Sequence, residues 1–140
     1  MARGIITAPQ PEAVEAGAVV MQRGGNAVDA AITCALVQTV VDPQMCGLAG
    51  FGSMHLYLPK KGFHGFIDFH TRAPAAVTDD MWEDQIVGES RDGFGFFLKE
   101  RQNEVGYQSI MIPGSLKAYY EAVQELSLIH ISEPTRRTPI

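Results

Sequence analysis

PEAVEAGAVVMQRGGNAVDAAITCALVQTVVDP, residues 11–43, is the stretch that decides the fold. In its first part, small apolar residues recur at the i, i+3, i+4, i+7, i+8 spacing of one helix face, at Ala13, Ala16, Gly17, Val20 and Met21. A face of such small side chains predicts a helix that packs closely against another element. Gly24 and Gly25 should end this helix, because glycine adopts the left-handed conformation of a helix C-terminus at little cost.

The rest of the stretch predicts a second helix over residues 27–41. Asn26 is a favoured N-cap residue, and Asp29 three positions later completes the pattern of a capping box. The helix is apolar nearly all round, which indicates burial on more than one side, and it is too short to span a bilayer. Asp42 should end it, since a residue that precedes proline avoids the helical conformation.

Residues 53–70 have the pattern of a β-hairpin. In SMHLYL, residues 53–58, apolar and polar side chains alternate with the period of a half-buried strand. PKKG, residues 59–62, predicts the turn, and HGFIDFH, residues 64–70, predicts the return strand. His55 and His64 are therefore interpreted as solvent-facing strand residues rather than metal ligands.

The glycines that precede the hairpin are expected to serve packing. Gly47, Gly50 and Gly52 allow a tight loop whose backbone approaches another element closely. The order of these glycines is not the Gly-x-Gly-x-x-Gly of dinucleotide-binding loops, and a strand follows them where those loops lead into a helix. Phosphate binding is therefore disfavoured.

The segment after the hairpin is less regular. Thr78, Asp79 and Asp80 predict the start of a short helix through Trp82, with acidic residues in its first turn. Residues 84–106 are punctuated by glycine and predict an irregular excursion over the core. YQSIMIPG, residues 107–114, predicts a strand, and SLKAYYEAVQE, residues 115–125, predicts an amphipathic helix.

Composition limits the classes of function. The chain has 140 residues with 46% hydrophobic content, which fits one domain, or part of a larger one, with a buried core. The net charge of −5, without a cluster of basic residues in the apparent fold, argues against nucleic acid as a partner. Cys34 and Cys46 lie in apolar surroundings and are expected to be buried free thiols. No metal-ligand spacing links them to the histidines, and neither metal nor cofactor is expected.

Localisation is predicted from the N-terminus. MARGIITAPQP, residues 1–11, lacks the apolar core and the cleavage site of a signal peptide, which predicts a cytoplasmic protein without a membrane partner. A periplasmic or secreted protein is the alternative if the N-terminus is incomplete.

The last fifteen residues, LSLIHISEPTRRTPI (126–140), change character abruptly. LSLIHISEPTR is identical to the in-frame translation of a sequence that resembles a transposase-type sequencing-library adapter. Residues 126–140 are therefore expected to be a non-native tail, and residues 1–125 an incomplete domain. A natural basic tail carrying Arg136 and Arg137 is the alternative. A genomic sequence that continues through these codons would contradict the adapter interpretation.

Four stretches of the chain occur in the order that one enzyme family shows: residues 7–31, 46–57, 66–76 and 109–123. On these stretches the chain resembles the N-terminal part of the large subunit of the γ-glutamyltranspeptidase family. The resemblance implies an α/β fold, a fragment of the αββα sandwich of N-terminal-nucleophile hydrolases, with two stacked sheets between helical layers. It also implies a proenzyme that cuts itself before a threonine, whose hydroxyl then attacks a γ-glutamyl amide to form an acyl-enzyme.

The resemblance covers scaffold and pocket but not the nucleophile. The family's threonine belongs to the C-terminal small subunit, and none of the threonines before residue 125 matches it, namely Thr7, Thr33, Thr39, Thr71 and Thr78. We therefore expect no catalytic residue in this chain and no turnover by it alone. The missing C-terminal part of the same precursor is the expected partner, beside a small γ-glutamyl or related amide substrate.

The strand end FIDFHTRAPAA, residues 66–76, is the candidate substrate site. The family pattern D-x-R-E-x-A-P aligns on Asp68 and Ala73-Pro74, so His70 occupies the position of the arginine that holds the substrate carboxylate, and Thr71 that of the acid. Arginine offers a permanent bidentate fork, whereas an imidazole is charged only part of the time near neutral pH. Losing that fork is expected to weaken carboxylate binding by a few kcal/mol.

Arg72 is the second candidate in this site. In an extended segment it shares a face with His70, about 6–7 Å further on, and could hold the carboxylate instead. Asp68 and Thr71 are then expected to support these two side chains. Alternatively, these residues are only the solvent-exposed end of a strand and bind no substrate. Arg72 then pairs with Asp68 or with the acids Asp79 and Asp80.

A function of another class stays open on the sequence. The chain could be a non-catalytic binding or structural module that folds alone. Helix 27–41 argues against it, because its apolar surface on several sides needs further layers of structure to cover it.

Overall fold

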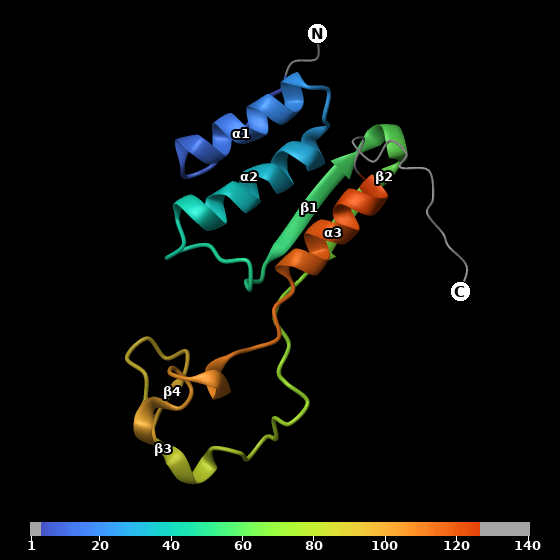
Figure 1. Cartoon of the computed structure of the whole chain (residues 1–140). Coiled ribbons are helices and arrows are strands. Elements are labelled where there is room, and N and C mark those ends of the chain that lie inside the picture. Colours follow the sequence, from blue (N-terminus) through green and yellow to red (C-terminus); the bar gives the residue numbers. More distant parts are fainter. Residues whose placement is uncertain (1–3, 127–140) are drawn as a thin grey trace, which may run out of the picture. The chain divides into compact units, whose positions relative to one another are not determined.

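The computed structural model describes residues 4–126. Of the predicted tail, residues 126–140, only Leu126 lies among them, as the last residue of a helix. The described residues divide into two compact units, residues 4–70 with 113–126 and residues 71–112. The first unit contains the elements α1 (Pro11–Gln22), α2 (Ala27–Val41), β1 (Ser53–Leu58), β2 (Phe63–Asp68) and α3 (Ser115–Leu126) (Figure 1).

The pair α1 and α2 confirms the prediction from residues 11–43. Pro11 occupies the first helical position, where its missing N–H is not needed, and Gly24 follows the helix with φ +96°. Ala13 and Gly17 are the buried residues of α1. A Cβ at Gly17 would lie 3.0 Å from the Ala30 carbonyl oxygen of α2, so the small face allows the two helices to approach closely.

The predicted capping box of α2 is also present. The Asn26 side-chain oxygen accepts hydrogen bonds from the backbone N–H groups of Val28 (2.7 Å) and Asp29 (3.0 Å). The Asp29 carboxylate accepts one in return from the Asn26 N–H at 2.8 Å. Asn26 Nδ2 then donates to the Leu126 carbonyl at 2.9 Å, which ties the start of α2 to the end of α3.

The predicted hairpin forms, with β1 and β2 antiparallel and Gly62 in the turn at φ +64°. One face of the hairpin packs on α2 and α3 around a core of Val28, Ile32, Leu56, Ala122 and Leu126. The opposite face has no helix on it among the described residues, and its Tyr57 and Phe66 are each 68% exposed. This unit is thus a helical layer on one side of a two-stranded sheet.

Residues 71–112 form a second small unit rather than a wholly irregular excursion. Strands β3 (Ile86–Glu89) and β4 (Phe96–Leu98) pair in antiparallel fashion, with Leu98 buried. The predicted helix at 78–82 is wrong: turns occupy these residues, and a single 3-10 turn follows at Glu83–Gln85. So short a segment pays the entropy of nucleating a helix without enough turns to recover it.

The predicted strand at 107–114 is wrong as well. Tyr107–Ser109 form a 3-10 turn after Gly106, whose φ is +95°. Ile112 alone pairs with Arg72, in one isolated antiparallel bridge. A strand needs a ladder of partners, and Pro113 removes the next donor from this one.

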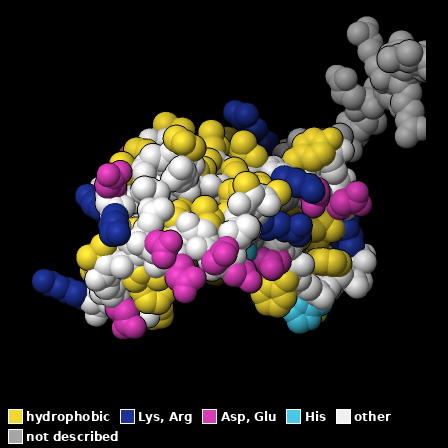
Figure 2. All heavy atoms as spheres, turned by 90° about the horizontal axis from the view of Figure 1, so that it is seen from below, with side chains coloured by type: hydrophobic (Ala, Val, Ile, Leu, Met, Phe, Trp, Pro, Cys, Tyr) yellow, Lys and Arg dark blue, Asp and Glu magenta, His cyan; other side chains and the backbone are white. Residues whose placement is uncertain are grey.

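Large apolar side chains stay exposed in both units. Val40 of α2 is 77% exposed, and Phe94 in residues 71–112 is 94% exposed. Figure 2 shows hydrophobic side chains scattered over the face it presents, with a row of acidic side chains among them. Over the described part of the chain, no helix has the length and apolar character that crossing a membrane requires.

Candidate functional site

The polar end of β2 brings Asp68 and His70 together. The Asp68 carboxylate accepts a hydrogen bond from the His70 backbone N–H at 3.1 Å, and His70 Nδ1 lies 2.9 Å from the same oxygen. An aspartate that bonds the backbone two residues on forms an Asx turn, which ends the strand and turns the imidazole outward. The His70 and Asp68 side chains are 62% and 77% exposed, so both are open to a ligand.

Glycines of two other segments fix the backbone beside His70. The Phe69 N–H donates to the Gly52 carbonyl at 3.0 Å. A Cβ at Gly114 would lie only 2.4 Å from the Phe69 carbonyl oxygen, and the N–H groups of Gly114 and Ser115 both donate to the Gly50 carbonyl. The close approach predicted for the glycine loop is confirmed at Gly50 and Gly52, but it is wrong for Gly47, whose Cβ would meet nothing within 4 Å. The sequence did not predict the contact of Gly114 with Phe69, because no local pattern indicates a contact between residues 45 positions apart.

Thr71 and Arg72 open the second unit, so the four predicted site residues fall on both sides of the boundary at His70. Thr71 is half-buried and Arg72 is exposed. The backbone of Arg72 exchanges hydrogen bonds with Ile112 at 2.9 and 3.3 Å. Within the described residues of this unit, no ion pair joins Arg72 to Asp79 or Asp80. The role of all four residues in binding substrate stays a prediction.

Phe51 is a neighbour of His70 that sequence reasoning did not single out. The two rings have centroids 5.5 Å apart and are tilted by 45°. Phe51 also lines a cavity of about 350 Å³, together with Gln38, Cys46, Ser115 and Tyr119. Burial raises the pKa of the Tyr119 phenol, which keeps a neutral hydroxyl at this wall. The cavity offers mixed apolar and neutral polar contacts beside the strand end.

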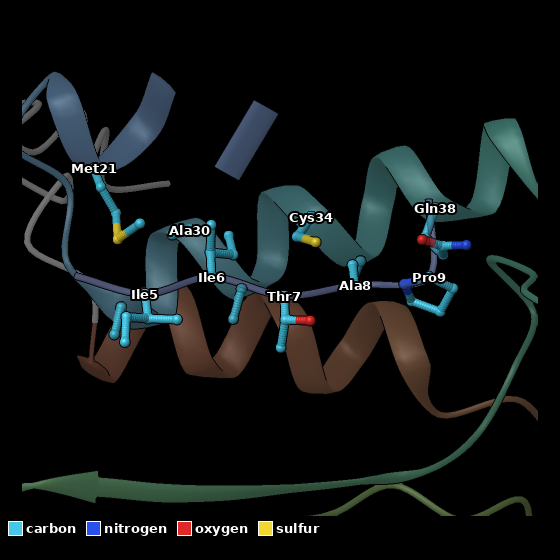
Figure 3. Close-up of a pocket in the computed structure, with 12 residues that line it drawn as sticks. Ile5, Ile6, Thr7, Ala8, Pro9, Met21, Ala30, Cys34 and Gln38 are labelled. Carbon is cyan, nitrogen blue, oxygen red and sulfur yellow. The ribbon is translucent and has the colours of Figure 1, made fainter. Parts of the chain in front are cut away.

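A second cavity, of about 420 Å³, lies between residues 5–9 and α2 (Figure 3). Its lining is mostly apolar and includes Ile6, Met21, Ala30 and Cys34. Gln38 lines it too, and its Nε2 donates to Asp42 at 3.3 Å while Oε1 has no partner. None of the predicted site residues, Asp68, His70, Thr71 and Arg72, lines this cavity.

The two cysteines are expected to differ in reactivity. Both are free; Cys34 is buried and Cys46 half-buried, which confirms the predicted burial for the first and corrects it for the second. Burial also raises the pKa of the Cys34 thiol, which disfavours the reactive thiolate. Alkylation by iodoacetamide, followed by peptide mass spectrometry, should modify Cys34 about tenfold more slowly than Cys46, because local opening must precede its reaction.

The same reaction in 8 M urea is the control. Unfolding removes the burial, so the two thiols should then react at similar rates. Equal rates in native buffer would contradict the packing of α1 on α2 described above.

Within residues 4–126, no three side chains of His, Cys, Asp or Glu come together as ligands for a metal ion. His55 and His64 are exposed, as expected of strand residues that face solvent.

The chain is similar in sequence to one enzyme family and to several of its characterised members. A sequence model described as Gamma-glutamyltranspeptidase matches residues 13–134. The chain is 35% identical over 133 residues to the Acylase ACY 1 proenzyme of Pseudomonas sp. (strain V22), covering 94% of this chain and 23% of that protein. It is 34% identical over 122 residues to the Glutathione hydrolase proenzyme of Bacillus subtilis (strain 168), covering 87% and 19% respectively.

Solved structures of gamma-glutamyltranspeptidases are also similar to this chain. A gamma-glutamyltranspeptidase from Pseudomonas nitroreducens, complexed with L-DON, superposes with a TM-score of 0.72 at 30% identity, over 89% of this chain and 34% of that one. The Helicobacter pylori gamma-glutamyltranspeptidase gives the same TM-score at 26% identity, over 89% and 33%.

These likenesses confirm the predicted fold class, an α/β fragment of an N-terminal-nucleophile hydrolase-type αββα sandwich. The chain spans about a fifth to a quarter of the length of the curated relatives quoted above, and about a third of the solved chains. The match to the family model covers more than half of the chain and includes Asp68, His70, Thr71 and Arg72. The chain therefore belongs to the gamma-glutamyltranspeptidase family.

Proposed function

We propose that this chain is the N-terminal part of the large subunit of a γ-glutamyltranspeptidase-like enzyme. When complete, that enzyme cleaves or transfers γ-glutamyl or related acyl amides through an N-terminal threonine. The family match over residues 13–134 carries the proposal, and the relatives named proenzymes support it because each is several times longer than the segment matched.

The reaction divides between the two parts of the precursor. The threonine hydroxyl attacks the amide carbonyl, the amine leaves with the threonine's proton, and an acyl ester remains. Water or an amino-acid amine then attacks the ester and restores the hydroxyl. Residues 1–125 supply none of these reacting groups; they supply the scaffold and the binding groups at the strand end.

In this proposal, His70 and Arg72 bind the acid end of the substrate, and Asp68 and Thr71 support them. Asp68 already holds the His70 imidazole through Nδ1 at 2.9 Å, which orients the ring and leaves Nε2 to meet a substrate carboxylate. Phe51 limits the movement of the ring from one side. A carboxylate is the group that such an arrangement holds best.

The same residues favour a substrate other than a plain γ-glutamyl amide. His70 replaces a bidentate arginine, so the grip on an amino-acid carboxylate is weaker and less directional. A dicarboxylate monoamide or a cephalosporin-type side chain suits this site. The similarity to an acylase, at 35% identity, supports the choice.

The test of this function is recovery of the reading frame downstream of codon 125 in the source DNA. The extended protein should cut itself before a threonine and hydrolyse a γ-glutamyl or glutaryl p-nitroanilide. The 140-residue chain should turn over neither compound. A downstream frame without a self-processing threonine would sink the proposal, as would turnover by the 140-residue chain alone.

Substrate choice is tested by His70→Arg in the extended protein. Restoring the bidentate fork should improve kcat/KM for the γ-glutamyl amide by about tenfold or more, the equivalent of one additional charge-assisted hydrogen bond. The glutaryl amide, which keeps the terminal carboxylate but lacks the α-amino group, serves as the comparison substrate. Strong γ-glutamyl activity before the substitution, unchanged after it, would contradict the altered specificity.

A further inference from the structure

The uncovered face of the β1–β2 hairpin carries two histidines that meet. His55 lies opposite Phe66 and His64 opposite Tyr57, so the two histidines are diagonal neighbours on one face of the antiparallel pair. Their Nε2 atoms are 2.8 Å apart, and their ring centroids are 5.0 Å apart. Both side chains are exposed.

Aromatic neighbours hold each ring in place. Phe66 stacks on His55 with centroids 4.5 Å apart and an interplanar angle of 18°. Tyr57 meets the His64 ring edge-on at 5.3 Å. Because the hairpin ladder fixes the backbone and these contacts restrict the side chains, both nitrogens are positioned before any ligand arrives.

The spacing suits two ligands of one metal ion. The two Nε2 atoms are 2.8 Å apart. A metal ion at the usual imidazole distance of about 2.0–2.1 Å from each of them would have an N–metal–N angle of about 84–89°. That angle is the right angle between adjacent ligands in tetragonal Cu(II) or Ni(II) complexes, and it is well below the tetrahedral angle that Zn(II) adopts in structural sites.

We propose that His55 and His64 form a two-histidine chelate for Cu(II), and more weakly for Ni(II), on the exposed face of the hairpin. Water completes the coordination shell, since no third His, Cys, Asp or Glu joins this pair among the described residues. This site is separate from the acyl-transfer chemistry proposed above and does not depend on it.

Proton balance poses no obstacle. In the metal-free hydrogen bond, one Nε2 carries the proton and the other accepts it. For both lone pairs to face the metal, that proton moves through solvent to the Nδ1 atom of the same exposed ring. Both imidazoles are then neutral, which is the form that binds metal, and no net proton is released.

The test is copper titration of the 140-residue chain, followed by calorimetry and electron paramagnetic resonance. One equivalent of Cu(II) should bind with the spectrum of two nitrogen ligands, and Ni(II) should bind less tightly, in the order of divalent ions for nitrogen sites. His55→Gln and His64→Gln should each lower the affinity for this Cu(II) ion by about tenfold or more, because either change converts a two-histidine chelate into a single ligand.

His70→Gln is the matched control, since it removes an imidazole from another place in the chain and should leave the copper equivalent unchanged. Far-UV circular dichroism checks that each variant keeps the hairpin. In the unmodified protein, bound Cu(II) should broaden the ring resonances of His55 and His64 before those of His70. Copper binding that survives the double variant His55→Gln/His64→Gln, or broadening centred on His70, would overturn the proposal.

Discussion

Replacing Gly114 with alanine is expected to destabilise the chain by about 3 kcal/mol, at the upper end of what overpacking costs. The new methyl would lie 2.4 Å from the Phe69 carbonyl oxygen and 3.0 Å from its carbon. Both are main-chain atoms, so no side-chain rotation relieves the clash. Either Phe69 or the start of α3 must move, and the hydrogen bonds of Gly114 and Ser115 to the Gly50 carbonyl must stretch.

Urea denaturation followed by far-UV circular dichroism measures this effect. Gly47→Ala is the matched control, because nothing lies within 4 Å of its new Cβ and its φ is not in the left-handed region. A Gly114→Ala variant as stable as Gly47→Ala would show that Phe69 does not lie where it is described. Since Phe69 precedes His70, the same variant of the extended enzyme should also lose substrate affinity.

Gly17→Val is expected to cost about 2–3 kcal/mol, through overpacking between α1 and α2. Its Cβ would lie 2.1 Å from Ile6 Cδ1 and 3.0 Å from the Ala30 carbonyl oxygen. Ile6 is flexible enough to turn away, whereas the Ala30 carbonyl belongs to the α2 backbone. The added methyl groups therefore push the two helices apart and weaken the packing around Cys34.

Glu15→Val is the control for this change, because it places the same β-branched side chain at an exposed position of α1. The unfolding midpoint in urea should fall clearly for Gly17→Val and stay within error for Glu15→Val. Faster alkylation of Cys34 in Gly17→Val would locate the loosened contact. A Gly17→Val variant with the original midpoint would contradict the close approach of the helices.

The elements that the sequence predicted correctly are those whose signals are local. The helical spacing from Ala13 to Met21, the Asn26–Asp29 capping box and the alternation in residues 53–58 each act within one or two turns of chain. The wrong elements lack such support. Residues 78–82 are too few to nucleate a helix. A strand at 107–114 would need a partner strand, and of these residues only Ile112 pairs, with Arg72.

The candidate site was predictable only in part, for a related reason. Asp68 and His70 are two residues apart, so an Asx turn follows from local geometry. The position of the Arg72 side chain depends on how the segment beyond His70 folds, which no local pattern determines. The meeting of His55 with His64 depends on the hairpin register, since a shift of one residue would send one of them to the other face.

The single bridge between Arg72 and Ile112 has a consequence for how such a chain can diversify. It pairs Arg72, the second residue of the 71–112 unit, with Ile112, its last, so the two ends of this unit already meet. Closing a longer or shorter loop across ends that already meet costs little extra entropy. We therefore expect insertions and deletions between residues 73 and 111 to destabilise the chain little. The length of this unit should accordingly vary among related chains more than that of the helices and the hairpin.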